Sequence, residues 1–136
     1  MGTVIPKRDR FLLDTHVLLW WLFNDPHLSE KATHVIGNPS RSILVSSASA
    51  WEISTKLRLG KLSGAEHIVR NLPALLRKSR MEVLPVGLNH ALLAGGLVSD
   101  HRDPFDRMLA AQAIIEKLSL ITSDKAFGDF SLRVIW

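Results

Sequence analysis

The chain has 136 residues, no cysteine and a net charge of +4, and these properties narrow the classes of protein it can represent. A chain of this length can bury a core without cross-links, and the lack of cysteine excludes disulfides and thiolate metal sites. With 46% hydrophobic and 22% charged residues the composition is that of a soluble protein, and the basic excess weakly favours a polyanionic partner.

The first 23 residues bear on whether the chain enters a membrane. Residues 1–9 have no apolar period, and we expect them to form a tail before a single domain over residues 10–136. Residues 11–23 are the most hydrophobic stretch, but they are too short to span a bilayer and lack a secretory cleavage site. We therefore expect a cytoplasmic protein without a membrane segment.

Short apolar runs alternate with segments of helical pattern. In chain order we predict strand 10–14, helix 15–23, a helix capped by Ser29 and ending near residue 37, strand 42–46, helix 47–59, helix 65–79, strand 82–86, helix 89–98, helix 104–118, strand 119–122 and strand 132–135. This alternation predicts an α/β fold of three layers, with a parallel sheet of about five strands between helices.

Four acidic residues lie at junctions between these elements. Asp14 and Asp124 follow strands, whereas Glu52 and Asp106 lie near the beginnings of helices. Because carboxyl ends of parallel strands share an edge with the helix amino ends, the four carboxylates are expected to meet there. Crowded carboxylates repel unless a cation balances them, and oxygen ligands favour Mg²⁺ or Mn²⁺.

Each acid also has a local structural interpretation. Asp14 can cap the helix that follows it, and Asp124 can serve as a turn residue. Glu52 can pair with the lysine four residues later, and Asp106 can complete a capping box with Asp103. None of the four acids would indicate a metal site alone, so the interpretation depends on their convergence.

Four motifs carry a resemblance to a known family. They are LDTH followed by VLLW at residues 13–20, AWEI at 50–53, HRDPFDR with AAQA at 101–113, and TSD at 122–124. In this order and spacing they resemble the motifs of PIN-domain proteins, and the most similar subgroup is the VapC-like toxins of bacterial toxin–antitoxin pairs. The resemblance runs from about residue 10 to the end of the chain.

This resemblance implies an endoribonuclease that depends on Mg²⁺ or Mn²⁺, is inhibited by a cognate antitoxin and forms a homodimer. Asp14, Glu52, Asp106 and Asp124 occupy the family's acidic positions. We hypothesise that the three aspartates contact the metal and that Glu52 holds it directly or through water. Cleavage by metal-activated water would leave a 5′-phosphate.

Further residues near the acids are candidates for contacts with RNA. Thr15 and Ser123 could bond phosphate or metal-bound water, although local turn bonds explain hydroxyls there equally well. Arg102 and Arg107 could meet substrate phosphates, together with His101. Arg107 follows Asp106 by one position and therefore points about 100° away around the helix.

The helix over residues 15–23 is apolar at every position from residue 17 onward. A helix at a domain surface needs only one apolar stripe. Trp20 and Trp21 therefore predict either burial on both sides or a protein interface, for a homodimer or an antitoxin segment.

Two other functional classes were weighed. A PIN-like module could bind RNA or protein without cutting, although the intact acidic set argues against it. A phosphatase of the familiar kind needs a second aspartate where His16 stands, and a receiver domain needs one within residues 82–86, which contain none.

Overall fold

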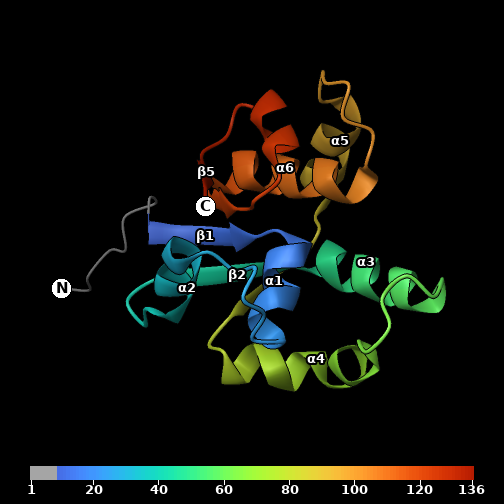
Figure 1. The fold of residues 1–136 in the computed structure, drawn as a ribbon. Coiled ribbons are helices and arrows are strands. Elements are labelled where there is room, and N and C mark those ends of the chain that lie inside the picture. The colour runs from blue at the N-terminus through green and yellow to red at the C-terminus, as the bar shows by residue number, and fades with distance from the viewer. Residues whose placement is uncertain (1–8) are drawn as a thin grey trace.

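Figure 1 shows the computed structural model, which describes residues 9–136, as a central sheet between two layers of helices. The elements follow the order β1 (Arg10–Leu13), α1 (Thr15–Leu22), α2 (Glu30–Gly37), β2 (Ser42–Ser46), α3 (Ser47–Arg58), α4 (Glu66–Lys78), β3 (Glu82–Leu84), α5 (Leu88–Gly96), α6 (Pro104–Glu116), β4 (Ser119–Ile121), a 3₁₀ helix η2 (Lys125–Asp129) and β5 (Val134–Ile135). The α/β fold class predicted from the alternation is confirmed. Residues 1–8 of the predicted tail lie outside the described residues.

The five strands are parallel and follow the order β3-β2-β1-β4-β5 across the sheet. Strand β1 is central, with Leu12 paired to Leu44 of β2 and to Leu120 of β4. The chain builds β2 and β3 on one side of β1, and returns to build β4 and β5 on the other side. The connections therefore diverge between β1 and β4, where open α/β sheets form a crevice at their carboxyl edge.

Alternation along β1 creates two hydrophobic cores, one on each face of the sheet. Phe11 and Leu13 pack with α1, α2, α3 and α4, whereas Leu12 packs with α6 and the segment around Phe127. Figure 1 shows α5 and α6 on one side of the sheet and α1, α2 and α4 on the other. Strands buried on both faces carry continuous apolar sequence, which is why these short runs were recognisable as strands.

Local capping chemistry fixes several helix boundaries. The Ser29 side chain accepts a hydrogen bond from the backbone N–H of Ala32 at the start of α2, as predicted. Helix α6 ends at Lys117, which adopts a left-handed conformation with φ of 56°. Helix α4 continues through Pro73. Two elements differ from the prediction, since the third strand is shorter than expected and η2 was not predicted.

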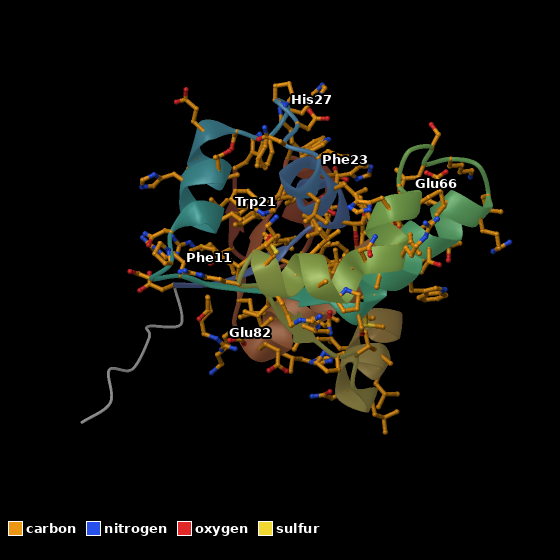
Figure 2. The ribbon with its side chains drawn as sticks, turned by 90° about the horizontal axis from the view of Figure 1, so that it is seen from below. Phe11, Trp21, Phe23, His27, Glu66 and Glu82 are labelled. Atoms are coloured by element: carbon orange, nitrogen blue, oxygen red, sulfur yellow. The ribbon has the colours of Figure 1, made fainter. Side chains whose placement is uncertain are left out.

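The apolar helix α1 is covered on most of its surface. Val17, Leu18 and Leu19 are buried, and the Trp20 ring stacks on His27 at a centroid distance of 5.7 Å. The Trp21 indole N–H donates to Ser79 Oγ over 3.2 Å, and Figure 2 shows this side chain farther inside than Phe23 and His27. The geometry therefore favours burial on both sides over an interface formed by Trp20 and Trp21.

In the part of the chain that the structure describes, every helix is too short or too polar to cross a membrane.

Candidate active site

The crevice between β1 and β4 is the centre of the candidate site. Leu13 and Ile121 are register partners at the ends of these two strands. Asp14 and Thr122 come next in the chain, so the fold places their side chains together. The Thr122 Oγ1 hydroxyl donates to Asp14 Oδ2 over 2.7 Å, in a buried bond across the switch point of the sheet.

Asp14 occupies the N-cap position of α1, but its carboxylate is used differently from an ordinary cap. It bonds Thr122, while the Asp14 backbone N–H donates to the Ile121 carbonyl. Burial raises the pKa of the Asp14 carboxyl and the charge of Glu52 raises it further, against lowering effects of Thr122 and His16. The ionised form of the Asp14 carboxyl is therefore disfavoured by burial unless a cation lies nearby.

Glu52 reaches the same region from α3. Its side chain is 3% exposed, and Oε2 accepts a hydrogen bond from Lys56 Nζ over 2.5 Å. Its other oxygen, Oε1, is buried and has no hydrogen-bond partner among residues 9–136. The lysine pair predicted as the local interpretation exists, but it satisfies only one oxygen of this carboxylate. A buried carboxylate oxygen left unpaired is costly in free energy.

Asp106 reaches the site from the first turn of α6. The predicted capping box is only half formed, because Asp103 accepts from the backbone N–H groups of Phe105 and Asp106, whereas Asp106 Oδ2 lies 2.9 Å from His101 Nε2. Burial raises the pKa of Asp106 to about 7, and the charges of Asp103 and Asp14 contribute, while His101 lowers it. The charge of Glu52 acts on Asp14 and the charge of Asp14 acts on Asp106, so each of these carboxylates lies within electrostatic range of the next.

The loop before α6 holds His101 in place. The Arg107 guanidinium donates to four backbone carbonyls of residues 94–101, and the His101 ring packs against Phe127 and Phe130. Because Nε, Nη1 and Nη2 of Arg107 are all engaged, the geometry assigns this residue to the loop and does not support its predicted contact with substrate.

Asp124 differs from the other three acids. Its carboxylate is exposed and accepts from the backbone N–H of Ala126, so it caps η2, a helix that was not predicted, whereas the local interpretation made it a turn residue. The Asp124 backbone N–H donates to Thr122 Oγ1, which connects it to Asp14 through one side chain. Asp124 therefore lies at the rim, and its role as a metal ligand stays a prediction.

The hydroxyl groups and arginine predicted to contact RNA occupy different environments. Thr15 is buried and donates to Ser49 Oγ over 2.9 Å, which joins α1 to α3 and leaves little support for a substrate contact. Ser123 and Arg102 are exposed. Sequence reasoning missed Thr122, although the register of β1 and β4 brings it next to Asp14.

The donor set fits a hard divalent cation. All three converging groups are carboxylates, and one of their oxygens, Glu52 Oε1, is buried and unpaired within residues 9–136. The groups that engage them now are Thr122, Lys56 and His101. In the described residues no three acidic or histidine side chains are arranged to hold a metal ion as they stand, so an ion could be held here only if side chains moved.

An apolar hollow of about 440 Å³ adjoins the acids, lined in part by residues from α3, α5 and α6. Trp51 precedes Glu52 and Phe105 precedes Asp106, and the two rings meet edge to face at a centroid distance of 4.8 Å. Trp51 is 63% exposed, and Leu88 and Leu92 of α5 are 79% and 70% exposed. An apolar hollow with exposed apolar side chains on the adjoining helices is a candidate surface for contact with another protein.

Comparisons with known proteins agree with this geometry. A family model described as the PIN domain matches residues 11–131. The structure is similar to VapBC2 from Rickettsia felis bound to a promoter DNA fragment, with a TM-score of 0.65, 19% identity and coverage of 93% of this chain and 97% of that chain. It is also similar to FitAcB from Neisseria gonorrhoeae, with a TM-score of 0.66, 20% identity and coverage of 93% and 96%.

A toxin–antitoxin complex from Klebsiella pneumoniae is similar as well, with a TM-score of 0.56, 17% identity and coverage of 92% of this chain and 95% of that chain. A search of the curated proteins finds no match. At these identities the structural likeness shows the fold alone.

Proposed function

Because the chain belongs to the PIN domain family, we propose that it is a divalent-metal-dependent nuclease that cuts RNA, with its site in a single domain over residues 10–136. The observation that carries this proposal is the convergence of Asp14, Glu52 and Asp106 at the switch point of the sheet. Burial and mutual repulsion raise the pKa values of both aspartates, and one Glu52 oxygen is unpaired among residues 9–136. Such a site gains stability when a cation arrives.

The residues divide into those that would hold Mg²⁺ or Mn²⁺ and those that orient them. Asp14, Glu52 and Asp106 would hold the ion, with Asp124 at the rim as a fourth candidate. When bound, a divalent ion supplies an acidic water and stabilises negative charge on a phosphate. Thr122 fixes Asp14 and His101 fixes Asp106. Asp106 is less buried than Asp14 and Glu52, which suits it to orient an attacking water toward the phosphate.

RNA cleavage is tested with Asp14→Asn, which keeps the size of the side chain and a partner for Thr122. Wild-type protein should cut RNA in Mg²⁺ to products with 5′-phosphate ends, and the variant should lose at least about 100-fold in rate. Circular dichroism checks the fold of the variant. Wild-type protein that binds RNA but never cuts it in Mg²⁺ or Mn²⁺ would instead support the non-cleaving module.

The biological role we propose is that of a toxin controlled by a cognate antitoxin. The support is the resemblance of the sequence motifs to those of VapC-like toxins, together with the similar fold of a chain in the toxin–antitoxin complex from Klebsiella pneumoniae. A small protein with a DNA-binding start, encoded directly upstream, should bind this chain and suppress its cleavage of RNA. A cytoplasmic location, as the sequence predicts, belongs to the same proposal.

The apolar hollow supports the predicted homodimer at a different place from helix α1. A second copy covering Trp51 and α5 would bury the most exposed apolar surface near the acids. Trp51→Asp should convert the dimer to a monomer in size-exclusion chromatography with light scattering. Val98→Asp is the matched control, because Val98 is 99% exposed and does not line the hollow. A wild-type monomer at high concentration would refute the dimer.

A further inference from the structure

Lys56 lies one helical turn after Glu52 on α3, and its surroundings are unusually acidic. Its ammonium nitrogen pairs with Glu52 Oε2, and the carboxylates of Asp103 and Asp106 also act on it electrostatically. Three acids from two helices therefore act on one lysine, whose side chain is 32% exposed.

An ordinary surface pair at this spacing does not account for the arrangement. Exposed pairs four residues apart on a helix contribute little to stability because water solvates both groups. Here the glutamate is 3% exposed, so water cannot replace the lysine as its partner. Removal of the ammonium would leave a buried carboxylate without a counter-charge, a far more costly state.

The Glu52 carboxylate also has one oxygen without a partner. Oε2 accepts a hydrogen bond from Lys56, whereas Oε1 has no hydrogen-bond partner among residues 9–136. A divalent ion that approached Oε1 would meet the positive charge of Lys56 on the other side of the carboxylate. Two cations would then share one glutamate, and their mutual repulsion would weaken the binding of the ion.

We propose that Lys56 is an internal counter-cation, a positioning residue that holds Glu52 in the metal-free protein and competes electrostatically with the divalent ion. This inference rests on the proposed metal site but not on RNA cleavage. It predicts opposite effects of one substitution. Loss of the lysine charge destabilises the metal-free protein and strengthens metal binding, whereas loss of a merely structural contact would not strengthen metal binding.

The test measures Mn²⁺ binding by electron paramagnetic resonance of the free ion, together with thermal unfolding in EDTA and in Mn²⁺. Lys56→Met should bind Mn²⁺ at least about tenfold more tightly, because one nearby positive charge is gone. It should also melt at a lower temperature than wild type in EDTA and gain more from added Mn²⁺. Lys56→Arg keeps the charge and should stay near the wild type in both measurements.

Two further variants separate the outcomes. Lys61→Met removes the same charge from an exposed lysine beyond α3 and should leave Mn²⁺ affinity within about twofold of wild type. Lys56→Gln keeps a hydrogen-bond donor for Glu52 and provides a folded, uncharged variant if the methionine variant does not fold. Unchanged or weaker Mn²⁺ binding by Lys56→Gln and Lys56→Met overturns the inference while the metal site stands. If wild type and variants all fail to bind Mn²⁺, the metal site and this inference both fall.

Discussion

Replacing Asp106 with asparagine tests whether the converging carboxylates destabilise the metal-free protein. The pKa of Asp106 is raised from 3.8 to about 7 in the folded state. Well below pH 3.8 both folded and unfolded chains carry the proton, and the acid costs no stability. As the pH rises toward 7 the unfolded chain releases its proton first, so wild-type stability should fall across this range.

The size of the effect follows from the pKa values. A change from 3.8 to about 7 corresponds to about 4 kcal/mol at pH 8, because each pKa unit corresponds to about 1.4 kcal/mol. Asparagine resembles the protonated acid in size and charge, so it removes this cost, and the effect of the bond with His101 is already contained in the raised pKa. Because Asp106 is partly accessible to water, which screens its charge, the variant should be about 2 to 4 kcal/mol more stable than wild type at pH 8 and close to wild type at pH 4.

Urea unfolding in EDTA, followed by tryptophan fluorescence from pH 4 to pH 8, measures how the stability difference between variant and wild type grows with pH. Asp129→Asn is the control, because Asp129 is exposed and its substitution should not reproduce this growth. A difference between Asp106→Asn and wild type that stays constant across this pH range would refute the reasoning.

Three further predictions follow from the same contacts. Mg²⁺ should raise the melting temperature more at pH 8 than at pH 5, because protons compete for Asp14 and Asp106; equal shifts would contradict this. Asp124→Asn should keep the cap of η2, whereas Asp124→Ala should lose the cap and about 1 kcal/mol of stability. Loss of RNA cleavage in both variants would establish that Asp124 does more than cap η2. Arg107→Met should destabilise the protein by about 2 to 4 kcal/mol and speed amide exchange in residues 97–103, and unchanged exchange would argue against its role in that loop.

The sequence predicts the fold well because the apolar runs are short and clearly bounded. Strand 42–46 and the starts of α1, α2, α3 and α6 match the structure, and strong local signals mark two of these starts, Ser29 for α2 and Asp103 with Pro104 for α6. The third strand is shorter than predicted because residues 85 and 86 leave the sheet. Helix α1 shows the limit of this reasoning, since an apolar sequence indicates burial but not whether the covering surface belongs to the same chain.

The site was less predictable, because its contacts depend on partners distant in sequence. The sequence predicted that Asp14, Glu52, Asp106 and Asp124 meet at one edge and that Lys56 can pair with Glu52, but it gave no reason to select Thr122 or to expect that the Glu52 carboxylate is buried. The roles of Thr122 and Lys56 depend on the fold, which buries the acidic side chains that they contact. For Arg107 the sequence suggested a substrate contact, because the residue follows Asp106. In the fold its guanidinium instead donates hydrogen bonds to four backbone carbonyls.

Asp14 and Asp124 show how topology separates two acids with the same local signal. Both follow a strand and stand at the N-cap position of a helix, so sequence alone gives them equal claims to a cap or a metal. The register of the strands distinguishes them. Leu13 and Ile121 are paired, so Asp14 is the first residue beyond the edge of the sheet, whereas Asp124 is the third. The Asp14 carboxylate is therefore buried and accepts a hydrogen bond from Thr122, whereas the Asp124 carboxylate is exposed and accepts from the backbone N–H of Ala126.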